Sequence, residues 1–181
     1  MSTLKLSGLN SGSSIIKAPD SGSTGVTFTL PASAGTLVTS ADVPITTTAT
    51  SNIGLGANAV DSITTGDYNV GLGDSALTDN TTGASNTGVG RMALFENTTG
   101  SSNTSVGMNS MLDNTTGGSN VAVGESALGN NTTGNNNVAM GKDALGTATT
   151  GHYNTAIGYT ALAANTTASN NTAIGRAVLY N

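Results

Sequence analysis

The sequence predicts an all-β fold, a repetitive β-solenoid built of eight 17-residue coils. Three observations lead to this prediction. The sequence NTAIG occurs at 154–158 and again at 171–175. One asparagine and one glycine recur in the same register without an insertion. The residues between them alternate in the way that short strands do. A fixed internal period is typical of solenoids, in which each coil contacts only its neighbours.

Two columns define the register over residues 51–181. We expect the glycines to mark a corner that needs positive φ or a close backbone approach. We expect the asparagines either to form a ladder of stacked amides or to serve turn geometry alone. The glycines are Gly56, Gly73, Gly90, Gly107, Gly124, Gly141, Gly158 and Gly175, and the asparagines are Asn52, Asn69, Asn86, Asn103, Asn120, Asn137, Asn154 and Asn171.

A short strand is expected just before each register glycine, as in TAI at 155–157, where a small residue separates two larger ones. We expect the larger residues to point inward, including the threonines at 87, 104, 155 and 172. A second apolar column lies four residues after the glycine, for example Leu77 and Leu94, in either a strand or a bend. Together these two columns predict a thin core.

A turn follows the second apolar column. The sequence Asn-Thr-Thr-Gly recurs at 80–83, 97–100, 114–117 and 131–134. Asn at the first position and Gly at the fourth favour a type I β-turn, in which the Asn side chain bonds its own backbone. The Asn-x-Thr glycosylation pattern in these segments is interpreted as a by-product of the turn.

The thin core and the open sheet ends predict oligomerisation. Columns of small Ala and Gly residues would allow neighbouring chains to approach closely. We therefore expect a parallel homotrimer in which each chain is a β-roll. An intertwined triple β-helix, with three chains sharing each turn, is the alternative.

Residues 1–50 do not follow the repeat, and they contain all three prolines of the chain. Short apolar stretches such as GVTFTLP, at 25–31, indicate an N-terminal β-rich segment. We expect this segment to attach or cap the solenoid, and residues 43–51 to form a linker or a first half-coil.

These two regions together resemble fibrous virion proteins of bacteriophages, tail fibres above all. The resemblance is carried by NTAIGYTAL with its NTTG turns, and by SSIIKAPDSGSTGVTFTLPASAGTLVTSADV. The repeat is also similar to the head repeats of trimeric autotransporter adhesins, which implies a trimeric β-roll that binds surfaces. No signal peptide, coiled-coil stalk or membrane anchor is visible in the sequence. The phage resemblance is therefore preferred, with a virion protein made in the host cytoplasm, and an extracellular or cell-surface adhesin is the alternative.

The residue inventory predicts a protein that is not an enzyme and that needs no cofactor or metal. The chain has no cysteine and one histidine, His152, which lies in a variable turn. Acidic residues occur singly, without the Gly-Asp nonapeptide pattern of calcium-binding solenoids. The five Lys and Arg are scattered, so nucleic acid is not an expected partner. Ice binding through threonine ladders is not the expected function, because the adjacent Thr-Thr pairs lie in a turn, where their side chains should diverge.

The variable columns are the expected contact surface for a host receptor or glycan. The residue after each register glycine varies most, which indicates an outward position. Aromatic and Arg side chains are common anchors for recognition. The candidate receptor-contact residues are Arg91, Phe95, Tyr159, Arg176 and Tyr180.

Overall fold

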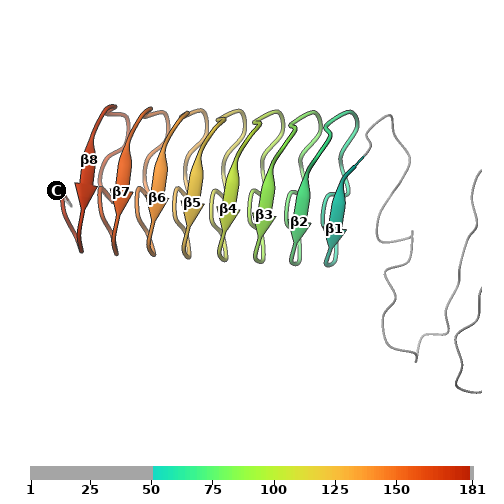
Figure 1. Ribbon diagram of the computed structural model, residues 1–181, viewed down its shortest axis with the longest axis horizontal. Helices are drawn as coiled ribbons and strands as arrows, with labels where there is room; N and C mark the ends of the chain where they lie inside the picture. Colours follow the sequence, from blue (N-terminus) through green and yellow to red (C-terminus); the bar gives the residue numbers. More distant parts are fainter. Residues whose placement is uncertain (1–50, 180–181) are drawn as a thin grey trace, which may run out of the picture. The chain divides into compact units, whose positions relative to one another are not determined.

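The computed structural model describes residues 51–179, and over this range the chain is a β-solenoid (Figure 1). Its strands form one parallel sheet in sequential order, and each residue pairs with the one 17 positions later, as Ile53 does with Val70. The predicted all-β solenoid is therefore confirmed. The strands are β1 (Ile53–Leu55), β2 (Val70–Leu72), β3 (Thr87–Val89), β4 (Thr104–Val106), β5 (Val121–Val123), β6 (Val138–Met140), β7 (Thr155–Ile157) and β8 (Thr172–Ile174).

Each turn of the solenoid is wound by one chain stacking on itself, rather than by several chains sharing a turn. The predicted N-terminal segment at 1–50 lies outside the described residues, as does Tyr180. The homotrimer stays a prediction at this point.

The register glycines form the corner after each strand. All eight have positive φ, between 128° and 137°, where a side chain is strained. The backbone of the next coil also lies against the first seven of them. A Cβ atom on Gly124, for example, would lie 2.6 Å from the carbonyl carbon of Gly141. Glycine is needed here both for its conformation and for the stacking distance.

The second apolar block is a bend and not a strand. Its Leu column has left-handed backbone conformation, as at Leu128 with φ of 50°. That conformation costs an L-residue about 1–2 kcal/mol. It is held by hydrogen bonds to the adjacent coil, since the amide of Leu128 donates to the carbonyl of Ala144 at 3.0 Å. Two other columns, represented by Ser126 and Ser119, are left-handed as well.

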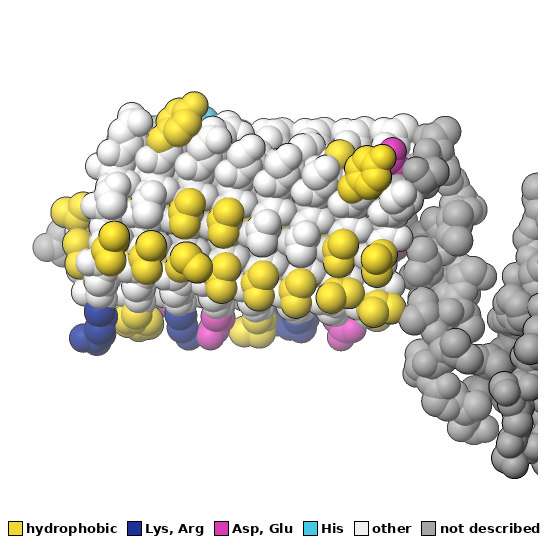
Figure 2. Space-filling view, viewed as in Figure 1, with side chains coloured by type: hydrophobic (Ala, Val, Ile, Leu, Met, Phe, Trp, Pro, Cys, Tyr) yellow, Lys and Arg dark blue, Asp and Glu magenta, His cyan; other side chains and the backbone are white. Residues whose placement is uncertain are grey.

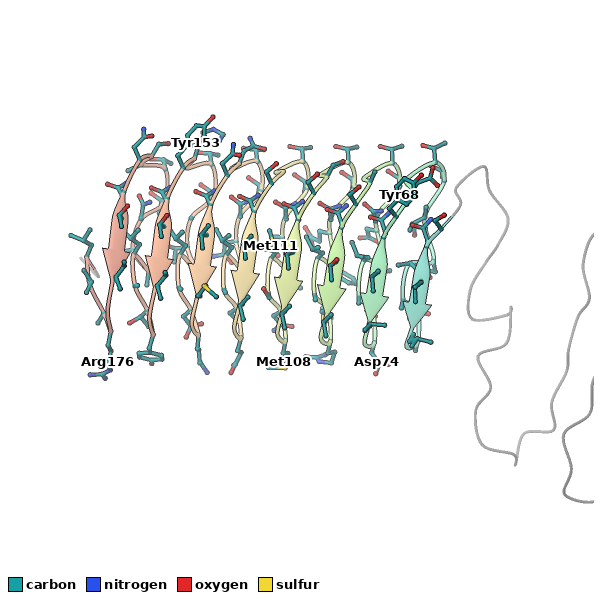
Figure 3. All side chains as sticks on the ribbon, viewed as in Figure 1. Tyr68, Asp74, Met108, Met111, Tyr153 and Arg176 are labelled. Carbon is teal, nitrogen blue, oxygen red and sulfur yellow. The ribbon has the colours of Figure 1, made fainter. Side chains whose placement is uncertain are left out.

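The core is narrower than predicted, because the middle residue of each strand points inward and the outer two point outward. In β5, Ala122 is fully buried while Val121 and Val123 are partly exposed. The prediction that the larger strand residues face inward is therefore wrong. The columns of small Ala and Gly residues were expected between chains, but they lie inside the coil. There they pack beside the buried Leu column, to which Met111 in Figure 3 belongs. A coil of this width admits only Gly, Ser or Ala at the inward strand position.

The register asparagines form a ladder along the solenoid axis. In the first seven, the side-chain oxygen accepts a hydrogen bond from the backbone amide of the next Asn, as between Asn86 and Asn69 at 3.0 Å. Their side-chain amides also donate to a turn carbonyl of their own coil, as Asn86 does to Gly100 at 2.8 Å. From Asn120 onward the side chains bond one another too, at 3.2 Å or less. The ladder and the turn geometry are therefore both present.

A second ladder is formed by the first residue of each NTTG turn. Asn97 donates to the Oδ1 atom of Asn80 at 2.8 Å, and Asn114 and Asn131 continue the series. Each of these side chains also bonds its own turn, as expected. The series stops at Ala148, so the buried Oδ1 atom of Asn131 has no hydrogen-bond donor.

The register glycines give a first prediction. Gly124→Ala should lower the free energy of unfolding by about 3 kcal/mol or more, because backbone strain adds to the clash with the next coil. Gly129→Ala is the matched control, since its Cβ would approach nothing closer than the Ser126 carbonyl oxygen at 3.2 Å. Urea unfolding followed by circular dichroism measures both variants. Equal losses of stability would contradict the role assigned to the register column.

The interrupted ladder gives a second prediction. Ala148→Asn should supply the missing donor to Asn131 and raise the free energy of unfolding by about 1 kcal/mol. Ala148→Asp has nearly the same shape but brings an oxygen where a donor is needed, so it should destabilise. Thermal unfolding of the two variants beside the original chain tests the difference, and a loss of stability with Asn would contradict the ladder.

Candidate functional site

The outward face of the sheet is the most uniform surface of the solenoid. Two columns of side chains run along it from β1 to β8, as the two central rows in Figure 2 show. In one column every residue is aliphatic, and in the other pairs of aliphatic residues alternate with pairs of threonines. The first column is Leu55, Leu72, Val89, Val106, Val123, Met140, Ile157 and Ile174, and the second is Ile53, Val70, Thr87, Thr104, Val121, Val138, Thr155 and Thr172.

This sheet face has the properties of a contact surface. No strand residue is charged. Parallel strands lie about 4.8 Å apart, so the eight strands give a strip about 34 Å long. The largest exposed apolar patch of a protein is often a functional surface. This face could not be predicted from strand alternation, because alternation alone does not say which residues face outward. The feature that does indicate the inward side is the middle residue of each strand, which is always Gly, Ser or Ala.

A ridge of varied side chains borders the sheet face, just after the register glycines. All eight ridge residues are exposed, and Figure 3 labels Asp74, Met108 and Arg176 along this edge. The variable column therefore does lie outside. It comprises Ala57, Asp74, Arg91, Met108, Glu125, Lys142, Tyr159 and Arg176.

Ridge residues contact their neighbours in the next coil. The Lys142 ammonium lies 3.0 Å from Glu125, and the Arg176 guanidinium lies 5.7 Å from the centre of the Tyr159 ring. The hydrogen bond to Glu125, with its charge, raises the pKa of Lys142 above its ordinary value. A raised pKa means that this pair favours the folded state below pH 10.5 and ceases to do so as the pH rises through the shifted value.

The structure brings together only part of the predicted receptor-contact set. Tyr159 and Arg176 are stacked in adjacent coils. Arg91 lies on the same ridge but four coils from Tyr159, about 19 Å away at the spacing of parallel strands. Phe95 is half-buried in a different column. Tyr180 lies outside the described residues.

The single histidine has a structural setting. The Nδ1 atom of His152 accepts a hydrogen bond from the backbone amide of Asn135 at 3.0 Å, and its own backbone amide donates to Ser169 at 2.9 Å. Neighbouring coils use Ser101 and Asn135 side chains in the same way. His152 therefore continues a column of side-chain acceptors that link successive turns.

The range 51–179 holds no cluster of three metal-ligating side chains. It also offers no long apolar helix of the kind that crosses a membrane. The Asn side chains of the four NTTG segments are fully buried, so these glycosylation patterns are closed in the folded coil.

Comparison with family models, curated proteins and solved structures finds no match to this chain.

The ridge gives a third prediction. Lys142→Met should leave the midpoint of thermal unfolding unchanged at neutral pH, because an exposed ion pair is screened by solvent. Leu128→Ala is the contrasting variant, since loss of a fully buried side chain costs about 2–5 kcal/mol. Differential scanning calorimetry measures both. A large loss with Lys142→Met would mean that the ridge charges hold the solenoid together.

Proposed function

We propose that this chain is a structural fibre protein of a bacteriophage virion, a tail fibre or another appendage, and that it supports attachment to the host surface. In this proposal it is not an enzyme. Three copies assemble in parallel into a rod, with their sheet faces turned toward one another. Residues 1–50 join the rod to other virion proteins, and the ridge remains outside for contact with a host receptor or glycan.

The observation that carries this proposal is the continuous uncharged sheet face. Exposed aliphatic side chains lose contact with water when copies associate, at about 25 cal/mol per Å² of apolar surface. A face that is uncharged along its whole length, with one column of aliphatic residues in every coil, suits a partner of the same length and repeat. A second and a third copy of this chain meet that condition, because their coils have the same axial spacing. The assignment to a virion is supported by the sequence resemblance.

The alternative is a secreted adhesin or surface-filament subunit of the same architecture. The two differ in where the protein occurs. Purified phage particles analysed by mass spectrometry should contain the chain, and its gene should lie among virion genes. Its presence among secretion genes and its absence from particles would favour the adhesin.

One observation favours a second candidate function. Thr87, Thr104, Thr155 and Thr172 point outward on a flat sheet, contrary to the sequence expectation, and such a face can order water. Aliphatic residues fill the other half of this column, which suits self-association better. Thermal hysteresis of a monomeric chain would favour ice binding.

The sheet face gives a fourth prediction. Light scattering should give a native mass three times the 17.7 kDa of one chain. Val123→Asp should dissociate the trimer, because it buries an unpaired charge at the contact. Thr116→Asp, on an exposed turn, should leave the mass unchanged.

Any native mass other than that of a trimer would contradict part of the proposal. A dimer would overturn the trimer, and dissociation of that dimer by Val123→Asp would keep the sheet face as the contact. A monomer would overturn both, and a Val123→Asp variant that stays trimeric would place the contact elsewhere.

A further inference from the structure

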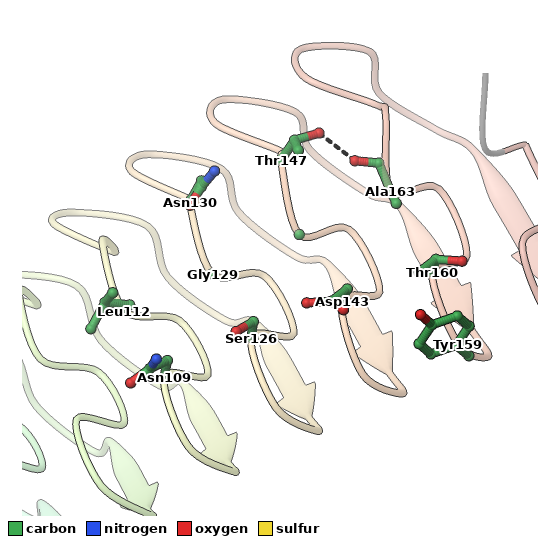
Figure 4. A pocket seen from close by; sticks show the side chains of 11 residues that line it. Asn109, Leu112, Ser126, Gly129, Asn130, Asp143, Thr147, Tyr159, Thr160 and Ala163 are labelled. Atoms are coloured by element: carbon green, nitrogen blue, oxygen red, sulfur yellow. Dashed lines mark hydrogen bonds between the residues drawn. The ribbon is translucent and has the colours of Figure 1, made fainter.

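A hollow lies on the side of the solenoid, where two successive coils have glycine at a position that carries a larger side chain in the preceding coils. Five residues after the register glycine stand Thr78, Phe95 and Leu112, then Gly129 and Gly146, then Ala163. The two glycines leave a cavity of about 430 Å³ between coils that are otherwise filled. Figure 4 shows the hollow, with Leu112 toward one end and Tyr159 toward the other. Its volume lies within the usual range of small-molecule sites.

The walls of the hollow combine an aromatic ring with short polar side chains. Tyr159 contributes its ring, which Arg176 holds from the neighbouring coil. Asp143, Ser126 and Thr160 also line it, and none of their side chains makes a hydrogen bond within residues 51–179. The lining contains no Lys or Arg. Lys142, next to Asp143 in the chain, interacts with it electrostatically, but its ammonium pairs with Glu125 at 3.0 Å. The carboxylate that lines the hollow therefore disfavours an anionic ligand.

Two amides complete the rim. Asn130 is exposed, and its side chain makes no hydrogen bond within the described coils. Asn109 lies at the Leu112 end, and its Oδ1 atom is buried without a hydrogen-bond donor. Native structures contain few such atoms. A ligand hydroxyl could satisfy this acceptor after a rotation of the amide.

We propose that this hollow binds a neutral saccharide. A sugar ring offers an apolar face of C–H groups to an aromatic side chain and a rim of hydroxyls to amides, carboxylates and other hydroxyls. Asp143 can accept from two hydroxyls, and hydrogen bonds to a charged acceptor are the stronger ones. Tyr159 supplies the platform for the ring. The ligand class follows from this combination of an apolar platform, hydrogen-bond acceptors and a lining without Lys or Arg.

The site is compatible with the proposed rod. None of its lining residues belongs to the eight strands, so the hollow is not part of the sheet face through which the copies would join. The inference rests on the proposed attachment role for its biological meaning, because a surface glycan is what such a rod would meet. The binding chemistry itself does not depend on assembly.

The test is saturation-transfer difference NMR on the full chain, with galactose, glucose, N-acetylglucosamine, lactose and maltose as probes. At least one neutral sugar should bind, and N-acetylneuraminic acid should not, because its carboxylate would meet Asp143. Gly146→Leu should abolish binding by filling the hollow with a side chain that the column already carries at Leu112. Tyr159→Ala should weaken it about tenfold.

The controls place the same changes elsewhere. Thr78→Leu puts a leucine in the same column two coils before Leu112, where the lining of the hollow begins. Tyr153→Ala removes an exposed tyrosine that does not line the hollow. Both should bind as the original chain does. Failure of every neutral sugar, or unchanged binding by both Gly146→Leu and Tyr159→Ala, overturns the inference. Preference for the acidic sugar overturns it as well. Light scattering on the same samples keeps this result separate, since a trimer without saccharide binding contradicts the hollow alone.

Discussion

The requirement that each residue stack on its counterpart 17 positions later governs the whole structure. Two sets of residues hold the coils in this register. The register glycines allow backbones to meet where a Cβ would lie within about 3 Å of the next coil, and the Asn ladder joins each coil to the next through buried hydrogen bonds. A single inserted residue would displace both from their partners. Buried polar groups without partners are costly, so the repeat tolerates changes of residue but not of length.

This constraint also explains why an apolar surface remains outside. A coil of 17 residues encloses a cross-section that the Leu column, the small strand residues and two asparagines already fill. The larger strand residues have no room inside, and strand geometry turns them to the opposite face. Retaining aliphatic residues there in all eight strands does not serve the interior of a single chain. The pattern is accounted for if the outer face becomes an interior when copies associate, which is the basis of the proposed rod.

Much of this fold could be predicted, and the failures have physical causes. Spacing alone fixed the coil length, the strands before the glycines and the NTTG turns, because each depends on residues with strong local preferences. The direction of the strand side chains was predicted wrongly, since alternation is unchanged when both faces are exchanged. The left-handed leucines could not be foreseen, because the conformation is unfavourable locally and is held by the neighbouring coils. Of the candidate contacts, Tyr159 and Arg176 came together because both follow a register glycine in adjacent coils, whereas Phe95 belongs to another column.

In a repeat protein of this kind, departures from the repeat are as informative as the repeat itself. The change from Asn131 to Ala148 leaves an acceptor unpaired, and so identifies the ladder as a series of dependent bonds. The change from Leu112 to Gly129 and Gly146 removes bulk where the backbone does not need glycine, since neither has positive φ. Such glycines weaken a chain through their greater freedom when unfolded. Two such glycines in successive coils make a recess beside polar side chains and the Tyr159 ring. The recess does not stabilise the coil, and binding of a ligand would explain why it is there.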